Sequence, residues 1–163
     1  MKIKYLLLVI CISGSSLIYA QNDTFKSLLN KYENENDITI VSISKTMLSL
    51  MPSNSNIKTG NIDIQNILPK IESLLIITSE KSAAKQKMND DFKLLINNNR
   101  DYEELMRIKS NQTDVIFNAI KKGDLISELI MVVNDERNFV AMQILGNFTM
   151  EEIQKIAQDA GVQ

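Results

Sequence analysis

Histidine is absent from the 163-residue sequence, and cysteine occurs once, at position 11. Without histidine the chain lacks the usual general base near neutral pH and the commonest transition-metal ligand. A lone cysteine closes no disulfide bond within the chain, and sulfur-ligated metal sites use several. The five glycines do not have the spacing of a phosphate-binding loop. These absences predict a protein with no metal or nucleotide cofactor, and they disfavour most catalytic chemistries.

The first twenty residues have the layout of a cleaved export signal. Lys2 and Lys4 precede an apolar run, Tyr5–Ile12, and small polar residues then lead to Ala20. The apolar run is too short to span a bilayer. We expect cleavage near Ala20, which leaves a single domain over residues 21–163 in the periplasm or outside the cell.

Lipid attachment at Cys11 is the alternative interpretation of this leader. Lipoprotein signals place a small residue directly before the modified cysteine, whereas Ile10 stands there, and the leader before Cys11 would be very short. We therefore expect no stable membrane anchor. Removal of the leader also removes Cys11, so the stability of the domain has to come from packing.

Composition limits the partners. The hydrophobic content of 44% is ample for a core, and the formal net charge is −2 with acidic and basic residues interspersed. A nucleic-acid partner needs a basic field, and an anionic membrane surface needs a polybasic segment. Neither is present in the sequence, so we expect no nucleic acid and no stable membrane contact.

Hydrophobic periodicity predicts helices and strands in the first hundred residues. A helix carries Phe25, Leu28, Leu29 and Tyr32 on one face, and on a later helix Lys87 and Asp91 have the spacing of a weak ion pair. The predicted elements begin with that first helix, a strand at Asp37–Ile43, a short helical turn from Ser44 and a loop at Ser53–Asn61. They continue with a helix around Ile64–Ile71 that Pro69 interrupts or kinks, a strand at Leu74–Thr78 and a long helix from Ser79 or Ser82 to Asn97.

From Asp101 onward the period changes to two. Short connections rich in turn-forming residues separate four segments, which predicts antiparallel hairpins between neighbours. The four strands are Tyr102–Lys109, Asp114–Lys121, Leu125–Val133 and Asn138–Leu145. A last helix begins with a capping box, Thr149 and Glu152. The fold class is therefore α+β, a mostly antiparallel sheet with a C-terminal four-strand meander packed against helices.

Both faces of this meander are apolar, so both need cover. Either the helices divide between the two faces, or the long helix and the C-terminal helix share one face and leave the other partly open. In the second case an apolar surface would be free to bind a second copy, another protein or an apolar ligand. The residues expected on that surface are Ile126, Ile130, Val132, Val140, Met142 and Ile144.

Carboxylates are the remaining candidates for catalysis. The adjacent pairs Asp90–Asp91, Glu103–Glu104 and Glu151–Glu152 do not suit a hydrolase, because neighbouring side chains diverge on a strand or helix. Lys45, which follows a strand, could act as a nucleophile or bind an anion, but such lysines are usually only exposed. An aromatic residue such as Tyr102, at the start of a half-buried strand, usually serves packing. No catalytic, cofactor-binding or metal-binding residue is predicted.

Three segments resemble a known family. They are Ile43–Leu48 (ISKTML), Tyr102–Ile108 (YEELMRI) and the run from Glu128 to Ala157 that contains the Gly146–Thr149 step. Together they resemble domain-of-unknown-function family 4252, a group of exported proteins of Bacteroides-like bacteria. The resemblance implies an exported protein. Genes of this family often lie near sigma-factor genes, which would imply a link to envelope-stress regulation. The resemblance implies no activity and no site residue. We therefore expect a non-catalytic binding or interaction module of the bacterial cell envelope, and the alternative is a carboxylate-dependent hydrolase acting on an extracytoplasmic substrate.

Overall fold

The computed structural model describes residues 23–50, 58–59, 62–63 and 67–159. The expected leader, residues 1–20, lies outside them, as does most of the expected loop at Ser53–Asn61. None of the helices in the described ranges combines the length and the apolar character needed to cross a membrane.

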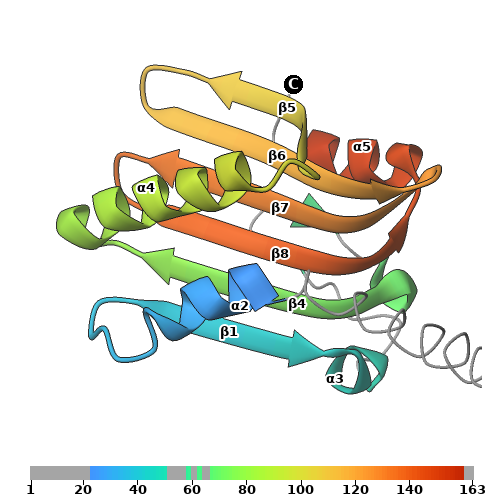
Figure 1. Cartoon of the computed structure of the whole chain (residues 1–163), viewed down its shortest axis with the longest axis horizontal. Helices are drawn as coiled ribbons and strands as arrows, with labels where there is room; N and C mark the ends of the chain where they lie inside the picture. Colours follow the sequence, from blue (N-terminus) through green and yellow to red (C-terminus); the bar gives the residue numbers. More distant parts are fainter. Residues whose placement is uncertain (1–22, 51–57, 60–61, 64–66, 160–163) are drawn as a thin grey trace, which may run out of the picture.

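Six strands form one antiparallel sheet, with the spatial order β1-β4-β8-β7-β6-β5 (Figure 1). Their bounds are β1 Thr39–Ser44, β4 Ile71–Ser79, β5 Glu103–Lys109, β6 Thr113–Lys122, β7 Leu125–Asp135 and β8 Phe139–Phe148. The helices are α2 Asp23–Asn30, α3 Lys45–Ser49, α4 Ser82–Asn98 and α5 Met150–Asp159, with a 3₁₀ turn, η1, at Leu68–Lys70. A separate small hairpin joins β2 Lys58–Thr59 to β3 Ile62–Asp63.

This architecture confirms the α+β class. Strands β5 to β8 pair with their neighbours along the chain, as the short connections predict. Around Pro69 the described part of the expected helix is only the 3₁₀ turn η1, because proline cannot donate a backbone hydrogen bond inside a helix. The strand that follows begins at Ile71, three residues before the predicted start.

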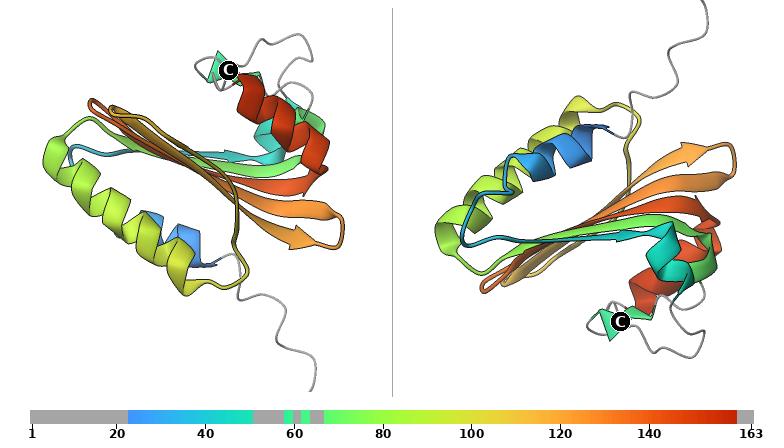
Figure 2. Two further views of the ribbon diagram at one scale, coloured as in Figure 1. Left: turned by 90° about the horizontal axis from the view of Figure 1, so that it is seen from above. Right: turned by 90° about the horizontal axis from the view of Figure 1, so that it is seen from below.

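Helices lie on both faces of the sheet (Figure 2). We call the face under α2 and α4 the α4 face, and the opposite face the α5 face. The core on the α4 face consists of Phe25, Leu29, Tyr32, Ile77, Met88, Phe92, Leu95, Ile130, Val132, Phe139 and Ala141. The core on the α5 face consists of Leu48, Ile67, Ile71, Leu74, Phe117, Ala119, Ile126, Leu129, Met131, Met142, Ile144, Phe148 and Ile153.

The long helix and the C-terminal helix therefore divide between the two faces, which is the first of the two arrangements that the sequence allows. Phe92 of α4 and Ile153 of α5 belong to different cores. The arrangement in which the long helix and the C-terminal helix cover the same face is wrong, because each face has enough apolar surface to require its own helix.

Candidate functional site

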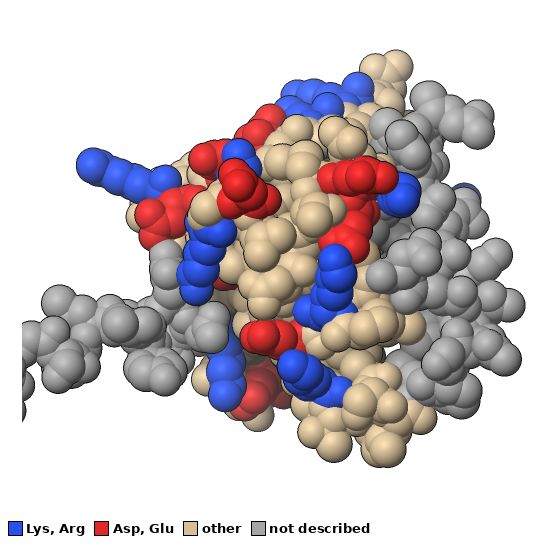
Figure 3. All heavy atoms as spheres, turned by 90° about the vertical axis from the view of Figure 1, so that its right-hand side faces the viewer, with Lys and Arg blue, Asp and Glu red and all other residues tan. Residues whose placement is uncertain are grey.

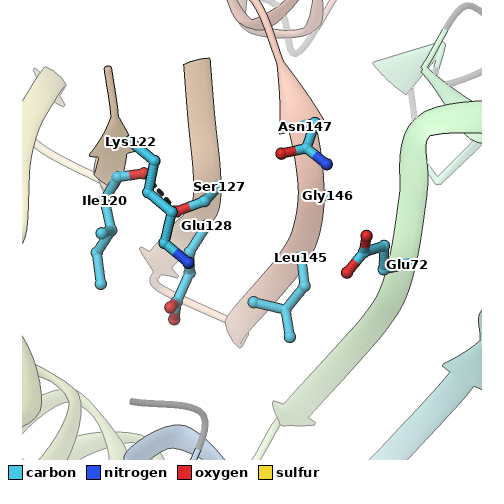
Figure 4. A pocket seen from close by; sticks show the side chains of 8 residues that line it. All are labelled: Glu72, Ile120, Lys122, Ser127, Glu128, Leu145, Gly146 and Asn147. Atoms are coloured by element: carbon cyan, nitrogen blue, oxygen red, sulfur yellow. Dashed lines mark hydrogen bonds between the residues drawn. The ribbon is translucent and has the colours of Figure 1, made fainter. Parts of the chain in front are cut away.

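A polar cavity lies at the end of the sheet where β6, β7 and β8 leave the helices of the α4 face (Figure 4). Its volume is about 240 Å³. The residues that line it are Glu72, Ile120, Lys122, Ser127, Glu128, Leu145, Gly146 and Asn147. Four strands supply them, β4, β6, β7 and β8, and three of these strands shift register beside the cavity, near Glu72, Ile120 and Ser127.

Glu128 is the buried charge of this cavity, with 4% of its surface exposed. It lies two and four residues before Ile130 and Val132, so its side chain shares their face of β7. Its Oε1 atom accepts a hydrogen bond from the Tyr102 hydroxyl at 2.5 Å and another from Nε2 of Gln143 at 2.6 Å. Gln143 lies on the neighbouring strand and is 3% exposed.

These two donors make the burial of Glu128 tolerable. A buried carboxylate costs several kcal/mol unless hydrogen bonds replace its water. The same contact changes Tyr102: burial raises the pKa of its hydroxyl, and the charge and hydrogen bond of Glu128 raise it further. Tyr102 therefore stays a donor across the physiological range. Both bonds use Oε1, so Oε2 has no hydrogen bond within the described part of the chain.

The other polar groups surround this carboxylate without forming a pair with it. Glu72 comes from β4, and β8 lies between β4 and the strand of Glu128. Figure 4 shows Leu145 between the two carboxylates. Ser127 already donates its hydroxyl to the Ile120 carbonyl at 3.2 Å. Lys122 is exposed at the rim. The cavity thus presents one fixed carboxylate, a second acid across an apolar side chain, and a lysine.

Gly146 is required by this packing. A Cβ atom at this position would overlap the ring of Phe148 and the backbone carbonyl of Lys70. The carbonyl cannot move aside as a flexible side chain could. The Gly146–Thr149 step of the sequence therefore joins β8 closely to η1 before α5 begins.

The six residues predicted as an open apolar surface do not form one. Ile130 and Val132 belong to the core of the α4 face, whereas Ile126, Met142 and Ile144 belong to that of the α5 face. All five are at most 5% exposed, and Val140 is half-buried. A register shift between Ile126 and Glu128 is one reason, because it moves Ile126 to the other face.

The adjacent carboxylates diverge, as the sequence predicts. Asp91 binds Lys31 at 2.6 Å, while Asp90 binds Gln86 on the same helix. The members of the other two pairs likewise contact different residues: Glu103 contacts Lys121, Glu104 contacts Arg107, Glu151 contacts Lys155 and Glu152 contacts Lys70. Lys87, expected to pair with Asp91, forms its ion pair with Glu35 at 3.1 Å.

Acidic and basic groups are interspersed on the side of the molecule seen in Figure 3. Lys45 is exposed at the first position of α3. The described residues contain no group of three or more histidine, cysteine, aspartate or glutamate side chains placed to hold a metal ion.

Sequence reasoning missed the hydrogen-bonded group of Tyr102, Glu128 and Gln143. The sequence favours packing over a role for the Tyr102 hydroxyl, yet this hydroxyl donates the hydrogen bond that orients Glu128. A signal was present: Glu128 is the one charged residue between Leu125 and Val133, and Gln143 is the one polar residue between Phe139 and Leu145, on two adjacent strands. Isolated polar residues of this kind are buried only with partners, so their pairing could have been inferred.

The model of the family described as "Domain of unknown function (DUF4252)" matches residues 32–156. The chain belongs to this family. The match spans the whole sheet, so the cavity and the Tyr102–Glu128–Gln143 group lie inside the DUF4252 domain. The comparison with curated proteins gave no match.

Proposed function

We propose that this DUF4252 protein is an exported, non-catalytic binding module, and that its cavity takes a small polar molecule carrying hydrogen-bond donors, an ammonium group above all. The observation that carries the proposal is the buried Glu128 carboxylate, which has one oxygen held by two donors and the other without a partner among the described residues. This second oxygen is not one of the buried unpartnered atoms of the described residues, so it is open to the cavity and a ligand can donate a hydrogen bond to it.

The charges around the cavity support the same ligand class. Glu72 and Glu128 exceed the single cation, Lys122, so the lining is net acidic. An ammonium group would be attracted to the two acids, and a carboxylate on the same molecule could reach Lys122. The cavity, about 240 Å³, suits a molecule of the size of an amino acid or a short amine.

The hydrolase alternative finds less support in this geometry. Carboxylate-dependent hydrolysis needs two acids that act on the same bond from opposite sides. Here Leu145 and strand β8 lie between the two acids, and Tyr102 and Gln143 hold the buried one in a fixed position (Figure 4).

A ligand panel with a matched variant tests the proposal. The panel contains amino acids, ethanolamine and short polyamines, with neutral monosaccharides for comparison, and binding is measured by calorimetry. Glu128→Gln keeps an oxygen for Tyr102 and Gln143 but replaces the unpartnered oxygen with an NH₂ donor. We expect ammonium compounds to bind the wild type and to lose affinity at least about tenfold in Glu128→Gln, since a charged hydrogen bond is worth roughly 1.5–3 kcal/mol. Glu33→Gln, at an exposed glutamate outside the cavity, should bind normally.

The same proteins decide between the two function classes. Chromogenic ester, peptide and glycoside substrates should give no turnover with the wild type. Turnover that Glu128→Gln or Glu72→Gln abolishes, in a protein that stays folded, would establish the hydrolase instead.

Export is the second part of the proposal and is supported by the sequence of the leader. Mass spectrometry of the protein from its native host should find an N-terminus near Gln21. A diacylglyceryl group on Cys11 would instead place the domain on a membrane.

A further inference from the structure

The two edges of the sheet differ in charge. The edge strand β5 (EELMRIK) carries four charged residues, which hinder pairing with another strand. The opposite edge strand, β1 (TIVSIS), has no charged residue and no proline. Among the described residues β4 is its only partner, and four of its six residues are exposed, so no described strand occupies its second side.

Exposed apolar side chains gather at this same edge. Six large hydrophobic residues are exposed in the described part of the chain, and half of them belong to β1, α3 or the residue after α3. Their exposed fractions are 40% for Val41, 57% for Met47 and 73% for Leu50. An uncharged edge that also carries apolar surface is the type of edge that natural proteins cover.

We propose that β1 is a dimerisation edge, where the β1 strands of two copies pair antiparallel about a two-fold axis at Val41. A two-fold axis perpendicular to the sheet keeps each face of the sheet on the same side in both copies. Two residues that face each other across this axis must therefore both be odd-numbered or both be even-numbered. With the axis at Val41, Thr39 faces the partner's Ile43, and Ile40 faces the partner's Ser42. Two six-stranded sheets become one continuous sheet of twelve strands.

Charge selects this register among those with the same symmetry. When Val41 faces itself, Asp37, two residues before β1, and the partner's Lys45, the first residue of α3, come to the same end of the strand pair, and this occurs twice. An axis at Ser42 would place Lys45 opposite Thr39, and an axis at Ile40 would place Asp37 opposite Ile43. Neither Asp37 nor Lys45 has an ion pair within the described residues, so both charges are available to a second copy.

A second copy of the chain fits this edge, because each copy supplies both an uncharged strand β1 and the charges of Asp37 and Lys45 that the other copy needs. Antiparallel pairing of one strand with itself brings every α3, with Met47 and Leu50, beside the start of the partner's β1. The proposed edge contains none of the residues that line the Glu128 cavity, so its failure would leave the proposed ligand binding unaffected.

Disulfide trapping tests the register. In a Cys11→Ser background, Val41→Cys places the only cysteine of the chain on the axis. Facing residues in antiparallel strands have Cα atoms about 4.5–5.5 Å apart, within disulfide range. We expect mild oxidation to convert Val41→Cys almost fully to a covalent dimer. Leu94→Cys, on the exposed surface of α4, should stay largely monomeric. Equal cross-linking of the two variants, or none in Val41→Cys, would overturn the proposal.

Sedimentation equilibrium tests the association without a covalent bond. Val41→Lys puts two like charges opposite each other and should raise the dimer dissociation constant at least about tenfold, whereas Leu94→Lys should not change it. Asp37→Lys should weaken the dimer, and adding Lys45→Asp should restore it. The double variant is the control for misfolding, because the second substitution would not restore dimerisation if Asp37→Lys had only damaged the fold. A wild type that stays monomeric at every concentration, or a charge swap without rescue, would contradict the proposal.

Discussion

Strands β7 and β8 contribute opposite kinds of side chain to the two ends of the α4 face. Under α4 they supply Ile130, Val132, Phe139 and Ala141, which pack in an apolar core. A few residues away, on the same face, they supply Glu128 and Gln143. Both ends are buried to a similar degree, so burial alone does not decide the residue type. The two ends differ in the residues that cover the sheet and contact these side chains.

At the apolar end that partner is a group of aromatic rings. Phe92 of α4 packs against Phe25 with ring centroids 5.3 Å apart and against Phe139 at 5.6 Å. At the polar end the partner is the Tyr102 hydroxyl, from the segment between α4 and β5. This sheet face is therefore closed by packing at one end, and at the other by hydrogen bonds to a buried carboxylate whose second oxygen is open to the cavity.

Removing the central ring should have the largest effect on stability. Phe92→Ala deletes a fully buried side chain between two aromatic partners, and we expect a loss of about 3–5 kcal/mol in the free energy of unfolding. Urea denaturation measures it. Leu94→Ala, on the same helix but 57% exposed, should lose less than about 0.5 kcal/mol. Similar losses in both variants would mean that α4 does not close the apolar end as described.

Adding a methyl group at the edge of the cavity should be the next most harmful change. Gly146→Ala forces a Cβ atom against Phe148 and the Lys70 backbone, and we expect a loss of about 3 kcal/mol in unfolding free energy. The neighbouring exposed residue gives the control, Asn147→Ala, which should be near neutral. A neutral Gly146→Ala would show that η1 does not pack closely on β8.

Removing one donor from the polar end should cost less. Tyr102→Phe leaves Glu128 with Gln143 as its single donor, and we expect a loss of about 2 kcal/mol. Glu128→Gln should lose less than Tyr102→Phe, because it keeps an acceptor for both donors. If Tyr102→Phe were neutral in thermal or urea unfolding, the hydroxyl contact would not support the buried acid.

The smallest effect should come from the ion pair that ties α2 to α4. Burial alone would raise the pKa of Asp91, but hydrogen bonds from Lys31 and Tyr32 and the charges of Lys31 and Lys87 outweigh it, so the pKa is lowered. A lowered native pKa stabilises the fold above the unfolded aspartate value of about 3.9, and this contribution disappears as the pH falls through the native value. Asp91→Asn should therefore lose up to about 1 kcal/mol at pH 7 and become equal to the wild type in strong acid. A difference that does not change between pH 7 and pH 3 would contradict this assignment.

Much of the fold could be predicted from local patterns. Period-two segments and short turns place β5 to β8, and Thr149 with Glu152 starts α5, where each backbone amide binds the other side chain as a capping box requires. Each of these signals is contained within a few residues. The assignment of helices to faces depends instead on contacts between segments that are distant in the sequence. Local patterns therefore could not decide between helices on both faces and helices on one face.

The candidate site was harder to predict for the same reason. Tyr102, Glu128 and Gln143 are separated by 15 to 41 residues, and only the sheet register brings them together. The apolar surface expected at Ile126 to Ile144 assumed unbroken alternation along β7. The register shift near Ser127 breaks that alternation, and periodicity alone does not reveal such a shift.

An amide NMR titration tests most directly whether the polar end of the α4 face is a binding site. Ethanolamine and amino acids are added to the ¹⁵N-labelled wild type and to Glu128→Gln, with monosaccharides as the neutral comparison. We expect ammonium compounds to shift the amide signals of Ser127, Glu128 and Leu145–Asn147 in the wild type and to leave those of Glu128→Gln unchanged. Absence of shifts at these residues with every ammonium compound, or equal shifts in the two proteins, would contradict it.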